Sequence, residues 1–123
     1  IEPGVYVYVE NLKFTFIQEI KDADYKIDKS SDCACLDAGR IEFPLTIRPL
    51  RNGDRFCPLG MRGSKLISDY MTDIKRSGFE KEEQLVITNA NGEIMWLVNE
   101  RPDNRYKVTD KTNMILKIVL KNH

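Results

Sequence analysis

Arginines gather in one stretch of the sequence, beside glycines and a serine. Four of them fall close together, at Arg48, Arg51, Arg55 and Arg62. A guanidinium group presents a planar fork of N–H donors that fits a phosphate bidentately, which an ammonium group cannot do. Gly60 and Gly63 allow close backbone approach or positive φ, and Ser64 is placed to cap a helix whose free N–H groups attract an anion. The pattern predicts a phosphate-contacting surface.

The charge of the chain is unevenly distributed. Residues 46–76 hold seven basic and three acidic residues, a net charge of +4. Residues 1–47 hold five basic and nine acidic residues, and residues 77–123 are balanced, so the whole chain is neutral. A cationic segment can attract a polyanion even when the protein has no net excess. The alternative is inert surface charge, in which the arginines pair with Asp54, Asp69 and Asp73.

We predict phosphate contacts from the cations of this stretch and from a flanking polar segment. The candidates are Arg48, Arg51, Arg55, Arg62, Lys65, Arg105 and Lys107. The residues expected to shape the loop are Gly53, Pro58, Gly60 and Gly63. Asp54 and Asp69 are expected to orient arginines, because a carboxylate would repel a phosphate.

Hydrophobic periodicity predicts the elements that must position these side chains. β-branched and aromatic runs predict a leading hairpin, closed by Glu10-Asn11, and a closing strand. The strands expected are 5–9, 12–20, 33–37, 45–50, 84–88, 93–98 and 113–121. Residues 25–27 form either a further short strand or part of a loop. Asn91-Gly92 is a strong hairpin signal, and Trp96 is expected in the core. Apolar residues spaced by three and four predict a helix over 64–76 that ends at Ser77-Gly78.

These elements make up one domain over residues 1–123. Its predicted class is mainly β (α+β), a small antiparallel β barrel or sandwich with one inserted helix near 64–76. Strand spacing alone does not separate a barrel from a sandwich.

The sequence offers no catalytic constellation. The only histidine is His123, at the end of the chain, and no glycine-rich P-loop occurs. Cys33, Cys35 and Cys57 lack the paired spacing of a zinc site, so we expect free thiols and no metal. The absence of a long apolar run and of a signal peptide predicts a cytoplasmic protein without a membrane segment.

Residues 33–120 resemble the C-terminal domain of bacterial tRNA(Ile)-lysidine synthetase. The matching residues are Arg48 or Arg51, Gly53-Asp54-Arg55-Phe56, Pro58-Leu59-Gly60-Met61, Gly63, Lys65 and Asp69, then Gly92-Glu93-Ile94, Trp96 and Arg105-Tyr106-Lys107-Val108-Thr109. Residues 1–32 match no family motif. They are either a leading hairpin of the same domain or part of a preceding linker region.

The resemblance implies a barrel-like fold related to a domain of the phenylalanyl-tRNA synthetase β chain. It also implies that the segment grips the tRNA body, around the acceptor stem, by backbone and shape. It implies further that the full enzyme uses ATP, with magnesium, to adenylate the wobble cytidine of a minor isoleucine tRNA, and that lysine then displaces AMP. The family's ATP signature, Ser-Gly-Gly-x-Asp-Ser, is absent here. The implied partners are tRNA(Ile) and an N-terminal catalytic domain that holds ATP, and a homodimer is a further expectation.

Three alternatives stay open at this point. Asp54, Arg55 and Pro58 could serve loop folding instead of binding. The segment could be a protein-interaction module that docks on its own catalytic domain or dimerises through a strand edge. An independent enzyme would use Cys57, whose thiolate Arg55 would favour, although the sequence offers no base partner.

Overall fold

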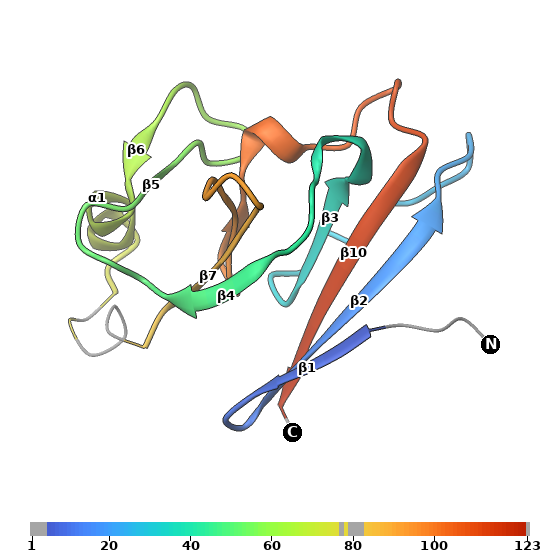
Figure 1. Cartoon of the computed structure of the whole chain (residues 1–123). Helices are drawn as coiled ribbons and strands as arrows, with labels where there is room; N and C mark the ends of the chain where they lie inside the picture. The colour runs from blue at the N-terminus through green and yellow to red at the C-terminus, as the bar shows by residue number, and fades with distance from the viewer. Residues whose placement is uncertain (1–4, 77, 79–82, 123) are drawn as a thin grey trace.

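The computed structural model describes residues 5–76, 78 and 83–122. In this part of the chain, two four-stranded antiparallel sheets and a two-stranded ribbon account for the strands (Figure 1). The first sheet contains, in spatial order, β1 (Val5–Val9), β2 (Leu12–Ile20), β10 (Met114–Asn122) and β3 (Cys33–Asp37). In Figure 1 the strands β1, β2 and β10 cross the view diagonally, so that the first and the last described strands belong to one layer.

The register of the first sheet confirms the predicted hairpin. Val9 faces Leu12 across the turn, and Glu10 adopts a φ of 52° there. β10 pairs with the whole of β2, from Met114 opposite Ile20 to Asn122 opposite Leu12. The closing strand and the leading hairpin therefore belong to one sheet.

The second sheet carries the predicted hairpin at Asn91-Gly92. Its strands are, in order, β4 (Thr46–Pro49), β7 (Leu85–Thr88), β8 (Ile94–Leu97) and β9 (Arg101–Pro102). Thr88 pairs with Ile94 but Ile87 pairs with Trp96, so Met95 is an extra residue on β8. This β-bulge directs both Met95 and Trp96 into the same core, where strict alternation would separate them.

The arginine-rich stretch forms the ribbon and the helix that follows it. β5 (Arg55–Phe56) pairs with β6 (Lys65–Leu66), and α1 (Ile67–Asp73) starts directly afterwards. Residues 57–64 form the connection between β5 and β6, at the upper left of Figure 1. Ile67, Tyr70 and Met71 are buried, which confirms the predicted apolar stripe of the helix.

The second sheet is the middle of three layers. One of its faces packs against the first sheet, around Phe14, Leu36, Ile87, Trp96, Leu116 and Ile118. Its other face packs against β5 and α1, around Phe56, Ile67, Tyr70, Met71, Val86, Ile94 and Leu97. Each large apolar side chain buried in this way stabilises the fold by about 1.5–3 kcal/mol. Trp96 is a core residue as predicted, with no exposed surface, and its Nε1 has no hydrogen-bond partner in the described structure.

Several expectations are corrected by the structure. The predicted mainly β class with one helix is confirmed, but the strand orders are open, so in the described part of the chain no sheet closes into the barrel that the resemblance implied, and the sheets are layered. Residues 25–27 do not form a strand. The helix spans Ile67–Asp73 instead of 64–76, because Lys65-Leu66 pair with Arg55-Phe56 and Lys75 adopts a φ of 65°. Its predicted end at Ser77 lies outside the described residues.

Helix α1 is only seven residues long. Across the described ranges of the chain, none of the helices combines the length and apolar character needed to cross a bilayer.

Candidate nucleic-acid interface

The turn between β4 and β5 is built around one carboxylate. Asp54 accepts hydrogen bonds from both terminal nitrogens of Arg48, at 2.8 Å and 3.0 Å, and from the backbone N–H of Arg51 at 2.7 Å. The Arg48 and Asp54 side chains are only 14% and 13% exposed. The backbone carbonyl of Asp54 also accepts the N–H of Ile67, which ties the turn to the start of α1. Asp54 thus orients an arginine, as the sequence predicted. Both terminal nitrogens of Arg48 already donate to Asp54.

The charges of this turn shift the pKa of both partners. Burial would raise the pKa of the Asp54 carboxyl, but the hydrogen bonds from Arg48 and the Arg51 amide, with the two arginine charges, outweigh burial and lower it. The hydrogen bond to Asp54 raises the pKa of Arg48. Both groups are therefore charged at neutral pH, and the ion pair holds the turn in a single geometry.

Two further predicted cations are held within the ribbon. The Nε of Arg55 donates to the Ser64 hydroxyl at 2.8 Å, so that the two ends of the 57–64 connection are joined. Lys65 forms an ion pair with Asp73 on α1. Ser64 is consequently a partner of Arg55 and does not cap the helix, whose first flanking residue is Leu66 without a side-chain cap. The predicted anion site at a serine-capped helix start is therefore wrong.

Glycines allow the sharp bends on either side of β5. Gly53, Gly60 and Gly63 have φ values of 87°, 84° and 72°. Side chains other than glycine rarely adopt this left-handed region. Pro58 is buried and forms an isolated β-bridge with Asp103, which fixes the connection against the second sheet.

Asp103 organises the region around Arg105, and sequence reasoning missed it. It has no exposed surface, and it accepts hydrogen bonds from Nε and Nη2 of Arg105, each at 2.9 Å, and from the Cys57 N–H at 2.8 Å. Glu93 accepts Nη1 of Arg105 at 2.9 Å. The hydrogen bonds to Asp103 raise the pKa of the Arg105 guanidinium. The only hint in the sequence is an aspartate two residues before an arginine, a spacing too common to be informative.

The same region brings the 57–64 connection against the polar segment that follows β9. The Leu59 N–H donates to the Pro102 carbonyl at 3.0 Å, and Nη1 of Arg101 donates to the Leu59 carbonyl at 2.9 Å. The Asn104 N–H donates to the Cys57 carbonyl. Residues 57–64 and the 3₁₀ helix η2 (Asn104–Tyr106) therefore lie side by side, although more than forty positions separate them.

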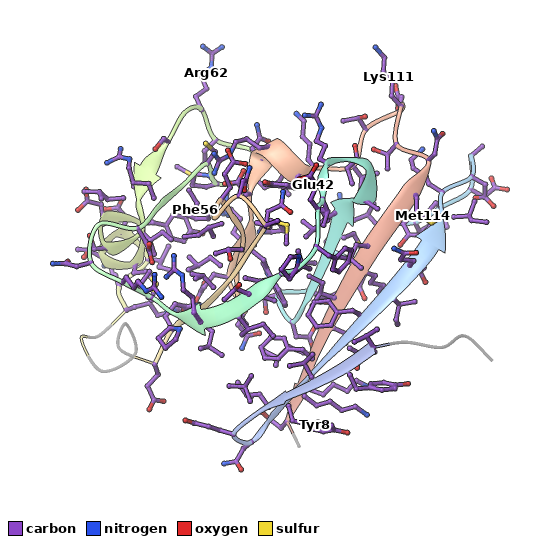
Figure 2. The ribbon with its side chains drawn as sticks, viewed as in Figure 1. Tyr8, Glu42, Phe56, Arg62, Lys111 and Met114 are labelled. Carbon is purple, nitrogen blue, oxygen red and sulfur yellow. The ribbon has the colours of Figure 1, made fainter. Side chains whose placement is uncertain are left out.

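Three of the predicted cations are exposed and have no direct side-chain partner among the described residues. Arg51, Arg62 and Lys107 are exposed, and their side chains form no hydrogen bond or ion pair with any residue that the structure describes. Arg51 lies before β5 and Arg62 after it, at the two ends of the ribbon. Figure 2 shows Arg62 projecting from the upper edge of the molecule. The chemistry available here is electrostatic, with exposed guanidinium groups on two connections of fixed shape. The Arg48–Asp54 ion pair holds the turn that carries Arg51, and hydrogen bonds to Ser64 and Asp103 hold the connection that carries Arg62.

Comparisons with known proteins add to this geometry. No family model matches the chain. It is 35% identical over 116 residues to tRNA(Ile)-lysidine synthase of Parabacteroides distasonis, which covers 94% of this chain and 26% of that protein. It is 36% identical over 107 residues to tRNA(Ile)-lysidine synthase of Bacteroides thetaiotaomicron, which covers 85% of this chain and 25% of that protein.

Solved structures agree on the fold. The crystal structure of the TILS C-terminal domain superposes with a TM-score of 0.71, at 18% identity, over 89% of this chain and 84% of that one. An N-terminal fragment of the phenylalanyl-tRNA synthetase β-subunit from Pyrococcus horikoshii superposes with a TM-score of 0.58, at 14% identity, over 72% of this chain and 27% of that one. The chain therefore shares the fold of the TILS C-terminal domain.

The relatives extend this conclusion from fold to family. The chain belongs to the tRNA(Ile)-lysidine synthase family, as a C-terminal domain. It spans about a quarter of the length of the curated relatives that it matches. The resemblance carried by the loop motif is therefore confirmed.

Proposed function

We propose that this chain is a tRNA-binding domain of a tRNA(Ile)-lysidine synthase and that it grips the tRNA body through phosphate contacts. The observation that carries the proposal is the pair of exposed guanidinium groups of Arg51 and Arg62. They lie at the two ends of the ribbon, on two connections that internal contacts hold in shape. Folded RNA is recognised largely through backbone and shape, which suits exposed arginines better than a base-reading pocket.

The seven predicted cations take different parts in this proposal. Arg51, Arg62 and Lys107 contact phosphates directly. Arg48 and Arg55 act mainly through the shape of the loop, because Asp54 and Ser64 already engage their N–H groups. Lys65 and Arg105 have ion-pair partners at their sites and would add charge at the margin of the surface.

The full-length protein, on this proposal, performs the chemistry named for its family: ATP, with magnesium, activates the wobble cytidine of tRNA(Ile), and lysine is joined to it. We assign ATP to another part of that protein, and no catalytic step to this chain. Its own contribution is to hold the substrate while the reaction takes place elsewhere.

A gel-shift titration with tRNA(Ile) at two salt concentrations tests the proposal. Arg51→Ala and Arg62→Ala should each weaken binding severalfold and reduce the slope of log K against log salt by about 0.7 to 0.9. Arg55→Ala should also weaken binding, with a loss of thermal stability because the Ser64 contact is removed. Arg40→Ala is the matched control, since Arg40 is an arginine with a 66% exposed side chain on the separate 3₁₀ helix η1 (Ala38–Arg40).

Unchanged affinity in folded Arg51→Ala and Arg62→Ala proteins would overturn the assignment. An equal loss in Arg40→Ala would show that any surface arginine contributes and that the loop has no special role.

Docking within a larger enzyme is the second candidate function. A groove of about 810 Å³ lies between β1 and the segment around β4, lined mainly by apolar side chains that include Val5, Val7, Phe16, Phe43 and Leu45. Val5 and Phe43 are 64% and 62% exposed. If the chain served docking alone, Phe43→Ser would abolish association with the catalytic domain, while the arginine variants would leave tRNA binding unchanged.

A further inference from the structure

The outer face of the first sheet carries a pattern that the arginine loop does not explain. The register places Tyr8, Lys13 and Lys121 in one row across β1, β2 and β10, and Tyr6, Thr15 and Val119 in the next. Alternation along each strand puts these side chains on the same face. The opposite face of these strands holds Phe14, Ile118 and Leu120, which belong to the core.

Two aromatic rings stand on this face at neighbouring positions of one strand. Tyr6 and Tyr8 are 53% and 54% exposed. Being two residues apart on β1, they are separated by about 7 Å along the strand. The ammonium group of Lys13 lies 4.5 Å from the centroid of the Tyr6 ring, so a cation and an aromatic ring already form one unit on the face.

The charges of the face are segregated along the strands. Lys13 and Lys121 lie opposite each other in the row of Tyr8, and Lys117 lies two positions before Val119 on β10. The acidic strand residues of this face, Glu19 and Asp37, both pair with Ile115, at the other end of the strands. Within the described strands, the half of the face with the tyrosines is therefore cationic and the other half carries the carboxylates.

The acidic half is also covered, which confines the available surface. Tyr25 and Val108 pack over Cys33, Cys35 and Ile115 in a small core, which Val119 of β10 borders. The Tyr25 hydroxyl donates to Glu19, and Lys117 lies 4.0 Å from Asp28 of the covering loop. In the described structure, the part of the face over β1, β2 and the end of β10 is exposed, with Tyr6 and Tyr8 each more than half exposed and Lys121 also exposed.

We infer that this face binds an unpaired stretch of RNA, with Tyr6 and Tyr8 stacking on bases and with Lys13 and Lys121 neutralising phosphates. Sheet-borne aromatic side chains that stack on successive bases, flanked by cations, are a general solution for single-stranded nucleic acid. The inference rests on the proposed function for the class of ligand, and it assigns the unpaired part of the RNA to a separate surface. Figure 2 shows Tyr8 at the lower edge of the molecule and Arg62 at the upper edge.

The test uses the 123-residue chain and a short fluorescein-labelled RNA oligonucleotide without self-pairing, followed by fluorescence anisotropy. The Tyr6→Ala/Tyr8→Ala double variant should bind at least about fivefold more weakly, because one stacked base is lost at each ring. Tyr6→Phe/Tyr8→Phe keeps both rings and should bind as the unmodified chain does. Val5→Thr, on the same strand and the opposite face, is the matched control for effects on the hairpin and should also leave binding unchanged.

The lysines are tested separately, by the salt dependence. Lys13→Gln/Lys121→Gln should reduce the slope of log K against log salt by about 1.4, at about 0.7 for each single-strand phosphate contact. This measurement tests the inference even if the double alanine variant unfolds. Both lysines lie on the surface of the sheet, so replacing them should leave the fold intact.

Several outcomes would overturn the inference. They are no binding of the oligonucleotide by the unmodified chain, equal binding by the folded double alanine variant, or sedimentation showing a dimer that the tyrosine substitutions dissociate. The proposed function fails independently. Binding of tRNA(Ile) that depends on Arg51 and Arg62 but leaves the oligonucleotide unbound removes only this inference, whereas oligonucleotide binding that depends on the tyrosines, without tRNA binding, removes only the proposed function.

Discussion

Replacing Asp54 should destabilise the turn between β4 and β5 while leaving the positive charges of Arg48 and Arg51 in place. Asp54→Ala removes the acceptor for three hydrogen bonds and leaves the 14% exposed guanidinium of Arg48 without its partner. Removing one member of a buried ion pair costs about 3–5 kcal/mol, and the residual exposure favours the lower end, about 3 kcal/mol. At about 2.1 cal/mol/K per residue, unfolding 123 residues has an entropy of about 0.26 kcal/mol/K, so the midpoint should fall by about 12 °C.

A double-mutant cycle isolates the interaction between the two side chains. Thermal unfolding of Asp54→Ala, Arg48→Met and the double variant should give a coupling energy of about 2 kcal/mol. The double variant should be more stable than Asp54→Ala, because it no longer holds an uncompensated guanidinium. Strict additivity of the two single substitutions would refute the claim that this ion pair holds the loop.

The lowered pKa of Asp54 adds a dependence on pH. Its contribution to stability is present above the unfolded-state pKa of about 3.9 and is lost as the pH falls from that value through the lower pKa of the folded state. Asp54→Asn keeps an accepting oxygen without the charge, so the difference in stability between the two proteins should shrink in acid. A difference that stays constant from pH 7 to pH 3 would contradict the assignment.

Three further perturbations follow from other contacts. Gly60→Ala should cost about 1 kcal/mol in urea denaturation, because φ is 84° although no atom lies near the added carbon, whereas Gly78→Ala, without a positive φ, should cost less than about 0.5 kcal/mol. Burial first, and then the hydrogen bond to Glu93, raise the pKa of Tyr106 to about 12. Its stabilisation is therefore complete below about pH 10 and is lost as the pH rises to the folded-state value; ultraviolet absorbance should show this late ionisation, and unfolding of Tyr106→Phe should lack the dependence. Asp103→Ala should destabilise by about 3–5 kcal/mol in thermal unfolding, with a smaller loss in Asp103→Asn, and a loss below about 1 kcal/mol would exclude its organising role.

The sequence by itself determined most of the secondary structure and the family. Alternating apolar residues in 5–9, 12–20 and 113–121 specify strands because a sheet with one buried face requires a period of two. Asn91-Gly92 specifies a hairpin because Gly92 can adopt a φ of 89°. The glycines around β5 predicted bends for the same reason, since the positive φ that each adopts is a local property of the backbone.

The tertiary structure alone decided which cations are free. Arg48 and Arg62 are equivalent in the sequence, but Asp54 engages the first and no described residue engages the second. Helix α1 starts at Ile67 and not at the predicted residue 64, because Lys65-Leu66 pair as a strand with residues nine to eleven positions away. Asp103 meets Cys57 across 46 positions. Such pairings depend on how distant segments come together, so local sequence patterns do not encode them. The same holds for the sheet face that carries Tyr6 and Tyr8, because only the register of β1, β2 and β10 places its side chains together.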